Sequence, residues 1–268
     1  LDAVASGFSS SGPDFGSPDI KLVHPPKVAL LSGEGTSSGN YGELWHFFEQ
    51  QLHYPITSLN TEHFDYINLA KYQVLIMPSG NYSDMLNENG MKKLQDWIKS
   101  GGKVIAIDRA LNTFANKDGF ALKSNKADED KDKEKPDNLV PYANRQRDYA
   151  KNMITGAVFK SKVDNTHPMA FGYPDAYFSL KLGSSSYKLL DQGYNVTYLE
   201  DQPKNVSGFA GSEALKTLGK TLLFGEERMG SGSLIYMVDN PLFRSFWENG
   251  KLFLVNALFF VNNNIAEL

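Results

Sequence analysis

The sequence contains no cysteine, which excludes thiolate nucleophiles, cysteine metal ligands and disulfide bonds together. It also has no apolar run near the ~20 residues that a membrane-spanning helix needs, and its first residues lack the basic and apolar regions of a signal peptide. We therefore expect neither a membrane span nor an export signal within these residues. A lack of cysteine fits cytosolic and exported proteins equally well, so it leaves the compartment open.

The chain also lacks an excess of positive charge. Its formal net charge is -4, and the Lys and Arg residues are interspersed with acidic ones, so no basic face is available to follow a phosphate backbone. We therefore do not expect a nucleic-acid partner. With 41% hydrophobic and 22% charged residues among 268, the composition is that of an ordinary globular protein that can bury a large core.

Two segments have the composition of loops or linkers. Residues 1–24 are rich in Ser, Gly and Pro, so we expect a linker from an upstream domain, followed by one domain over 25–268. Residues 126–135 are Lys, Asp and Glu apart from a single Ala. Such a run cannot bury apolar surface, so we expect a charged flexible loop over 123–138.

The remaining sequence alternates short apolar runs with amphipathic helical patterns, and past Tyr149 it becomes richer in strand patterns. Alternation of strands and helices predicts right-handed crossovers and a sheet covered on both faces. The expected fold is a three-layer α/β fold with a mainly parallel sheet, helices on both faces and a β-rich C-terminal half. Strands are expected at 27–32, 56–59, 74–77, 103–108, 154–160, 177–182, 195–199, 222–228 and 231–238, the last two as a hairpin. Helices are expected at 40–52, at 88–100 between Asn87 and the glycines at 101–102, and at 243–262.

The turns after the predicted parallel strands are polar or glycine-rich. Ligands of open α/β sheets bind at the carboxyl ends of the strands, so these turns define a candidate cleft. The turn at 33–39 lacks the spacing and the lysine of a phosphate-binding loop, and tight-turn use of glycine explains it better. Arg109 and Arg244 are expected to converge on this cleft, where two cationic side chains would suit a carboxylate. The candidate cleft-lining residues are Glu34, Ser79, Asn81, Asp108, Arg109, Asp239 and Arg244.

The order of these elements resembles the class I glutamine amidotransferases, whose fold is flavodoxin-like. An oxyanion-type turn at 79–81 follows the third strand, an elbow at 107–110 follows the fourth, and a hairpin comes late. In that family the elbow carries a Cys, and the late strand ends in the His that activates it. Here the elbow reads Asp108-Arg109-Ala110 and the hairpin ends in Val238-Asp239-Asn240-Pro241. The resemblance therefore implies the fold but not the amidotransferase reaction, since both thiol and imidazole are missing.

A second resemblance covers nearly the whole chain. It rests on the segments GEG at 33–35, YGELWHFFE at 41–49, DNTHP at 164–168, DNPLFRSFW at 239–247 and NALFF at 256–260. These look like the C-terminal part of large bacterial zinc carboxypeptidase-like proteins, in which an amidotransferase-like domain follows the peptidase domain. The resemblance implies an upstream peptidase domain as partner in cis, zinc bound there and not in this chain, and a parent that is periplasmic, at the outer surface or secreted.

Three functional hypotheses follow from these observations. The first is a non-catalytic accessory domain of such a peptidase. The second is a module that uses the former cleft to bind a peptide end, a sugar or another polar small molecule. The third is a metal-dependent hydrolase within this chain.

The third hypothesis rests on His46 and Glu49, which have the His-x-x-Glu spacing of zinc carboxypeptidases, with His167 as a third ligand. Helical spacing also places His46, Glu49 and His53 on one side of the helix. The two phenylalanines between His46 and Glu49 favour instead an amphipathic core helix with a solvated polar face, so we expect no metal site. His167 is then expected to be a structural residue bonded to nearby backbone, with a lone pocket group as the alternative.

Two structural expectations concern the end of the chain and the tryptophans. Asp239 and Arg244 are expected to form an ion pair that fixes the closing helix. Trp45, Trp97 and Trp247 each occur in an apolar helical pattern, so we expect them to be buried or half-buried.

Overall fold

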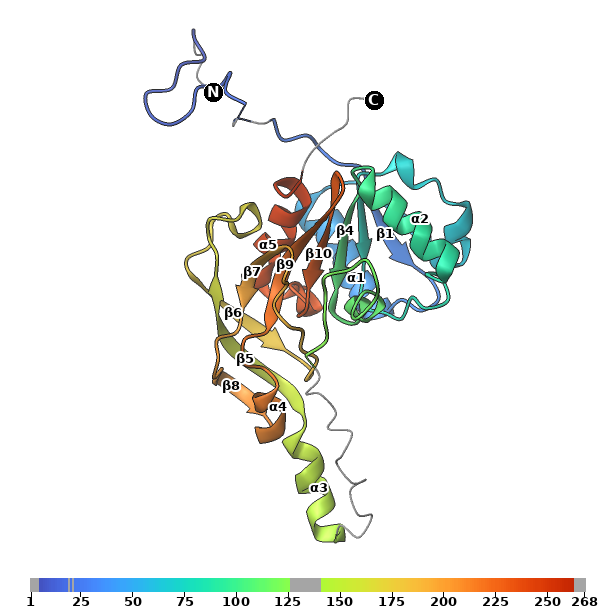
Figure 1. Ribbon diagram of the computed structural model, residues 1–268, viewed down its shortest axis with the longest axis vertical. Helices are drawn as coiled ribbons and strands as arrows, with labels where there is room; N and C mark the ends of the chain where they lie inside the picture. The colour runs from blue at the N-terminus through green and yellow to red at the C-terminus, as the bar shows by residue number, and fades with distance from the viewer. Residues whose placement is uncertain (1–4, 19, 21, 126–140, 263–268) are drawn as a thin grey trace.

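The computed structural model of the protein describes residues 5–18, 20, 22–125 and 141–262. Ten strands of this part of the chain form one sheet in the order β2-β1-β3-β4-β10-β9-β7-β5-β6, with β8 pairing to β5 (Figure 1). The first half alternates strands and helices as the sequence predicts. Its elements are β1 (Val28–Ser32), α1 (Ser38–His46), β2 (Ile56–Asn60), β3 (Val74–Met77), α2 (Glu88–Lys99) and β4 (Lys103–Ile107).

The second half is richer in strands, again as predicted. Its elements are α3 (Tyr142–Lys151), β5 (Ile154–Val163), β6 (Ala176–Lys181), β7 (Tyr194–Tyr198), β8 (Asn205–Ala210), α4 (Ser212–Lys216), β9 (Leu222–Met229), β10 (Gly232–Met237) and α5 (Glu248–Phe259). Short helical turns connect them: η1 (Phe47–Leu52), η2 (Thr61–Tyr66), η3 (Leu69–Lys71), η4 (Asp108–Thr113), η5 (Pro168–Ala170) and η6 (Phe243–Ser245).

The sheet is mixed, which corrects the prediction of a mainly parallel one. Strands β2, β1, β3, β4 and β10 are parallel to their neighbours in that order. The direction reverses between β10 and β9, which form the predicted hairpin, and β9, β7, β5, β6 and β8 all pair antiparallel. A two-residue turn can join antiparallel strands but not parallel ones, so the turn at residues 230–231 forces the reversal.

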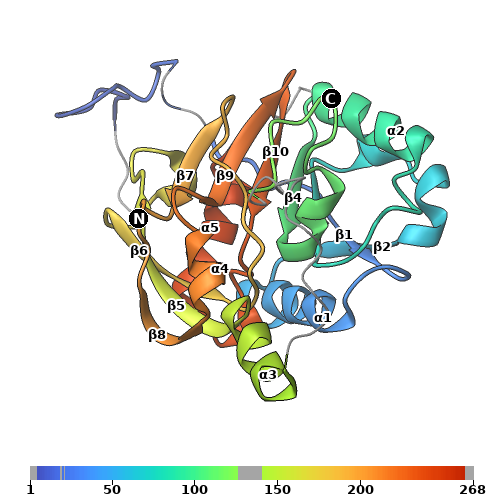
Figure 2. The same cartoon turned by 60° about the horizontal axis from the view of Figure 1, so that its bottom comes forward.

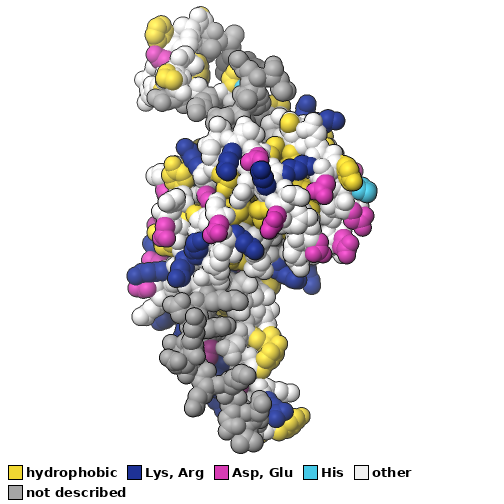
Figure 3. Space-filling view, turned by 45° about the vertical axis from the view of Figure 1, so that its right-hand side comes forward, with side chains coloured by type: hydrophobic (Ala, Val, Ile, Leu, Met, Phe, Trp, Pro, Cys, Tyr) yellow, Lys and Arg dark blue, Asp and Glu magenta, His cyan; other side chains and the backbone are white. Residues whose placement is uncertain are grey.

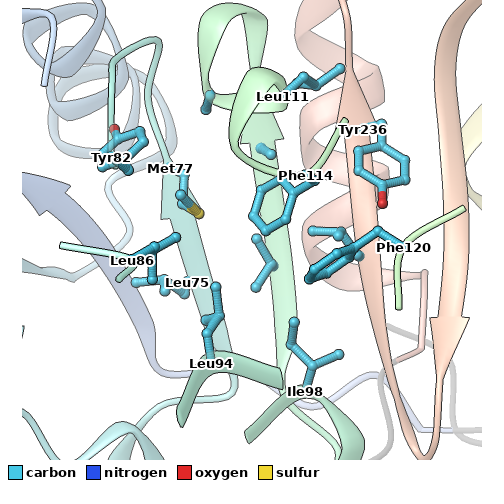
Figure 4. Packing of buried hydrophobic residues seen from close by; sticks show 14 of the residues in the cluster. Leu75, Met77, Tyr82, Leu86, Leu94, Ile98, Leu111, Phe114, Phe120 and Tyr236 are labelled. Carbon is cyan, nitrogen blue, oxygen red and sulfur yellow. The ribbon is translucent and has the colours of Figure 1, made fainter. Parts of the chain in front are cut away.

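Helices cover both faces of the sheet (Figures 1 and 2). On one face α2 packs with the turn η4 and the strands, where Leu94 and Ile98 of α2 belong to the same buried cluster as Phe114 and Tyr236 (Figure 4). On the other face α1 and α5 bury a second cluster that includes Phe48 and Phe253. Apolar burial stabilises about 25 cal/mol per Å², so these two layers are the main source of stability.

The antiparallel half turns away from the parallel half and carries a third, smaller core beneath α4 (Figure 1). Helix α3 extends beyond it and buries none of its residues. The sequence does not predict α3, because its polar composition offers no apolar stripe. Strand β8 was missed for a similar reason, since all of its central residues are exposed.

Two predicted helices differ from the structure near their ends. The helix predicted over 40–52 is α-helical to His46, continues as a π-helical turn, and stops at His53, whose φ is 51°. The helix predicted over 243–262 begins at Glu248, because Arg244 and Ser245 have φ of 51° and 60°. Left-handed residues cannot continue a right-handed helix, so α5 starts after them.

The tryptophan prediction is correct for two of three residues. Trp97 is 8% exposed and Trp247 is partly buried, but Trp45 is 48% exposed. Trp45 lies on the outer side of α1, while Leu44 and Phe48 of the same segment face the sheet. The apolar pattern around Trp45 therefore does not identify the buried side of this helix.

The linker and loop predictions are only partly covered by the described residues. The described part of 1–24 contains exposed apolar side chains, among them Phe8 and Leu22. Of the loop predicted over 123–138, residues 126–138 lie outside the described residues, and Ser124 forms a β-bridge with Tyr187. None of the helices described is long and apolar enough to cross a lipid bilayer. Figure 3 shows basic and acidic side chains interspersed on the face it displays.

Candidate functional site

The elbow after β4 places a carboxylate at the carboxyl edge of the parallel strands. Asp108 has a φ of 52°, a left-handed conformation that is costly for a residue other than Gly, Asn or Asp. The Ser79 hydroxyl, from the turn after β3, donates a 2.7 Å hydrogen bond to Oδ2 of Asp108. Burial raises the pKa of the Asp108 carboxyl, the Ser79 hydrogen bond opposes this, and the nearby negative charge of Asp239 raises the pKa further.

Asp239, just after the end of β10, carries the second carboxylate of this edge and forms a buried ion pair with Lys181. Nζ of Lys181 lies 2.8 Å from Oδ1 of Asp239, and their side chains are 2% and 7% exposed. The Ser179 hydroxyl donates a 2.5 Å hydrogen bond to Oδ2 of Asp239. Both oxygens of Asp239 are therefore occupied, and neither is free to act as a base.

The turn after β3 is also committed to internal contacts. Its Asn81 amide donates a 2.8 Å hydrogen bond to the Gly35 carbonyl, and the Ser37 amide donates to the Ser79 carbonyl at 2.9 Å. A side chain at Gly80 would lie only 2.4 Å from the Gly35 oxygen, so glycine is needed for this close approach. The amide of Asn81 is thus unavailable to stabilise an oxyanion.

The remaining candidate residues lie on the surface and do not share one cleft. Asn81 and Arg109 line a cavity of about 890 Å³ beside α2. Glu34 and Asn81 line another of about 370 Å³ next to η2. Arg244 lines a third, of about 410 Å³, at the start of α1. The expected convergence of Arg109 and Arg244 on one carboxylate is therefore wrong, because these two side chains line different cavities.

The expected ion pair between Asp239 and Arg244 is also wrong. Asp239 pairs with Lys181, while the Arg244 side chain is exposed and lies over the Phe243 ring, 5.2 Å from its centroid. The backbone amide of Arg244 instead donates a 2.7 Å hydrogen bond to Oε2 of Glu43. Oε1 of Glu43 accepts from the side-chain amides of Asn40 and Asn240. Glu43, which is 9% exposed, thus joins α1 to the segment before α5.

The residues of the metal-hydrolase hypothesis do not come together. His46 and Glu49 are exposed on α1 and η1, whereas His167 is 8% exposed. The described residues contain no group of three His, Cys, Asp or Glu side chains that could hold a metal ion. His167 accepts a 3.2 Å hydrogen bond from the Met169 amide, which confirms the expected bond to nearby backbone.

Sequence reasoning missed Lys181, Ser179 and Glu43. A detectable signal was present for the first two, because Tyr177, Ser179 and Lys181 are spaced by two in a predicted strand and must share one face. A lysine on the buried face of a strand predicts a carboxylate partner, because an unpaired buried charge is costly. Which carboxylate this is, Asp239, depends on how the sheet curves and cannot be predicted from the sequence of the strand alone.

No family model matches the sequence, and no curated protein matches it. Solved structures do match. A protein described as part of a GMP synthase, from Thermoplasma acidophilum, has 10% sequence identity and a TM-score of 0.51, with 88% of this chain and 94% of that chain covered. A ThuA-like protein from Bacteroides uniformis has 14% identity and a TM-score of 0.49, with 90% and 94% covered. A glutamine amidotransferase from Thermotoga maritima has 8% identity and a TM-score of 0.47, with 87% and 90% covered.

The similarity to the Thermoplasma protein supports an amidotransferase-like fold for this chain. It concerns the fold alone and does not bear on activity. The expectation that this chain belongs to a carboxypeptidase-like parent stays a prediction, since the similarity to these structures does not test it.

Proposed function

We propose that the chain is a non-catalytic accessory domain of a zinc carboxypeptidase-like protein, with a flavodoxin-like core and a zinc-binding peptidase domain upstream in cis. One observation carries the non-catalytic part of the proposal. The polar groups at the former catalytic edge bond to one another, as Ser79 does to Asp108 and Lys181 to Asp239. A nucleophile or base must instead present a free atom to its substrate.

The chemistry of the elbow agrees with this proposal. A carboxylate at Asp108 would need a partner that activates a water molecule or that stabilises a leaving group. The Ser79 hydroxyl and the Arg109 backbone amide instead donate to this carboxylate, which lowers its reactivity. The amide that would stabilise an oxyanion is bonded to Gly35. What remains is a rigid polar network that holds the loops of the edge together.

The non-catalytic proposal is tested by measuring ammonia release from glutamine and peptide hydrolysis by the purified chain, with and without added zinc. We expect no turnover above the rate without protein. Glutamine or peptide hydrolysis that falls in an Asp108→Asn variant would show that the elbow is catalytic and would overturn the proposal.

The accessory role is tested in the parent protein by deleting residues 25–268. We expect the peptidase domain to unfold at a lower temperature or to lose kcat/KM toward long peptides without losing it toward dipeptides. An unchanged unfolding temperature together with unchanged kinetics on both substrates would contradict an accessory role.

A second candidate function is binding of a polar ligand in the cavity beside α2. This cavity, of about 890 Å³, lies at the carboxyl ends of β3 and β4 and combines Arg109 and Lys117 with Asn81 and Asn112, whose side chains carry amide groups. Cationic and amide donors of this kind suit a carboxylate-bearing ligand. The test is calorimetric titration with a C-terminal dipeptide. Binding that is lost in Arg109→Ala and kept in Arg244→Ala supports this candidate, and equal effects of the two variants contradict it.

A further inference from the structure

A separate cavity lies at the opposite end of the sheet from Asp108. It has a volume of about 810 Å³ and surrounds the turn between β9 and β10. Ser233, next to this turn, pairs with Lys103, the first residue of β4. Asp108 comes directly after the last residue of β4, at the other end of the same strand. The cavity is therefore at the amino ends of the parallel strands. The residues that carry the argument below are His167, Tyr194, Glu226 and Arg228, all of which line it.

The floor of this cavity contains a buried carboxylate with one oxygen that accepts no hydrogen bond. Glu226 is 1% exposed, and its Oε2 lies 3.0 Å from Nε2 of His167. Nδ1 of His167 accepts from the Met169 amide, so Nε2 carries the proton and donates a hydrogen bond to Glu226. Oε1 of Glu226 has no hydrogen-bond donor among the described residues. A buried acceptor without a donor is uncommon in native proteins and points to a bound group that supplies one.

Two basic side chains lie near Glu226. Nε of Arg228 lies 3.5 Å from Oε1, which is an ion-pair distance but too long for a good hydrogen bond. The buried Lys103 also interacts electrostatically with Glu226, while its Nζ donates to the carbonyls of Ala257 and Leu258. The unsatisfied requirement at Oε1 is therefore for a hydrogen-bond donor and not for a further cation.

The aromatic ring of Tyr194 lies next to Glu226. Tyr194 is 43% exposed and pairs with Glu226 across β7 and β9. The Arg228 guanidinium lies over the Tyr194 ring, 5.3 Å from its centroid, and the His167 ring is 5.2 Å away from it. The side chain of Arg228 is itself 65% exposed. A ligand at this place would meet an aromatic ring, a guanidinium donor and a carboxylate acceptor together.

The geometry points to a binding site for a small neutral polyhydroxylated ligand, a monosaccharide or a unit of a longer sugar, at Glu226, Tyr194 and Arg228. Oε1 of Glu226 is shielded from solvent, so binding requires the exposed Arg228 side chain beside it to move aside. A hydroxyl both donates and accepts hydrogen bonds, so neighbouring hydroxyls can then donate to Oε1 of Glu226 and accept from Arg228. Carboxylates (Glu226 and Asp164) and the Arg228 guanidinium line the same cavity, so an ion of either sign meets a like charge, whereas a neutral hydroxyl can bond to both kinds of group. The apolar C–H face of a sugar ring can pack on Tyr194. This site is independent of the function proposed above.

The test is a titration of the full chain with D-glucose, D-galactose and D-mannose, followed by NMR of the Tyr194 and His167 ring signals. At least one of these sugars is expected to shift both signals in a saturable manner. D-glucosamine and D-glucuronate, which add a positive and a negative charge, are expected to bind at least about tenfold more weakly. A neutral capped tripeptide serves as the probe for a peptide ligand.

Two variants locate the site without disturbing the core. Tyr194→Ala and Arg228→Ala change exposed side chains, and each is expected to weaken sugar binding by about tenfold or more. Phe178→Ala removes another aromatic side chain, 42% exposed on β6, and is expected to leave binding unchanged. The inference is overturned if none of the neutral sugars gives a saturable shift, if a charged sugar or the peptide binds more tightly, or if Tyr194→Ala binds like the unmodified chain.

Discussion

Lys181 and Asp239 are joined by a buried ion pair of 2.8 Å, although their strands are far apart in the sheet. Lys181 ends β6, the last strand of the sheet order, and Asp239 follows β10 near its middle. The antiparallel half must curve for these residues to meet. The pair therefore fixes the position of this half relative to the parallel one.

Breaking this ion pair is expected to be strongly destabilising. Lys181→Met leaves the Asp239 carboxylate buried without its cation, which costs about 3–5 kcal/mol. The double variant Lys181→Met with Asp239→Asn removes both charges and should regain most of that loss. Urea unfolding of the four proteins in a double-mutant cycle measures the coupling.

The exposed pair of Lys220 and Asp201 is the matched control, with side chains 69% and 73% exposed. Lys220→Met is expected to change stability by less than about 1 kcal/mol. Similar losses in Lys181→Met and Lys220→Met would mean that burial does not determine the strength of these pairs.

Glu43 is expected to be important for the attachment of α5. Its two oxygens accept hydrogen bonds from Asn40, Asn240 and the Arg244 amide. Glu43→Ala leaves these donors without an acceptor and should cost about 2–3 kcal/mol in urea unfolding. Glu49→Ala, an exposed acidic residue on the adjoining turn, should cost much less, and equal costs would contradict this role.

The backbone of Asp108 predicts a difference between Asn and Ala at this position. Both Asp108→Asn and Asp108→Ala remove the charge, but Asn tolerates the left-handed conformation at φ 52° and can accept from Ser79. Asp108→Ala is therefore expected to be less stable than Asp108→Asn by about 1–2 kcal/mol in urea unfolding. Equal stabilities would indicate that the loop relaxes to another conformation.

Asp108 also predicts a pH dependence. Burial raises its pKa in the folded protein above the ordinary value of 3.8, so the folded state holds this proton to higher pH than the unfolded state. Its contribution to stability is complete below pH 3.8 and is lost as pH rises through the folded pKa. Asp108→Asn should lack this decline when urea midpoints are compared from pH 4 upward. Parallel curves for the two proteins would contradict the shift.

Lys103 predicts the opposite slope at higher pH. Burial lowers its pKa from 10.5 to about 7, an effect that the charge of Glu226 opposes. Between these values the unfolded chain binds more protons, so stability rises with pH from about 7 to 10.5 and falls as pH drops through about 7. Lys103→Met should flatten this rise in urea midpoints measured across that range. A rise of the same size in the variant would show that Lys103 is not its source.

The sequence predicts the elements that rest on local patterns. The run at 103–107 is wholly apolar after its lysine and forms β4, and the glycine turn at 230 joins the hairpin of β9 and β10. Helix α2 was found because its apolar residues repeat at helical spacing after the cap at Asn87, whose Oδ1 accepts from Asn89 and Gly90. These features depend only on neighbours along the chain.

The features that depend on distant residues could not be predicted in this way. Asp239 was assigned to Arg244, five residues later, because the curvature that brings Lys181 to it leaves no mark in either segment. The left-handed Arg244 and Ser245 before α5 were not recognised, because Phe243, Phe246 and Trp247 keep an apolar helical spacing around them. Glu226 appeared only as part of a strand, although a glutamate on the buried side of a strand is itself a sign of a polar partner.

The place of β10 in the sheet has a consequence for biosynthesis. β10 lies between β4 and β9 and completes the parallel half, yet it is synthesised after β5, β6, β7, β8 and β9, which follow β4 in the chain. Until then the nascent chain exposes the apolar edge of β4, a surface that other chains can pair with. Folding of the parallel half during translation therefore ends only after β10 has been synthesised, and a chain terminated before residue 232 would be a substrate for chaperones and proteases.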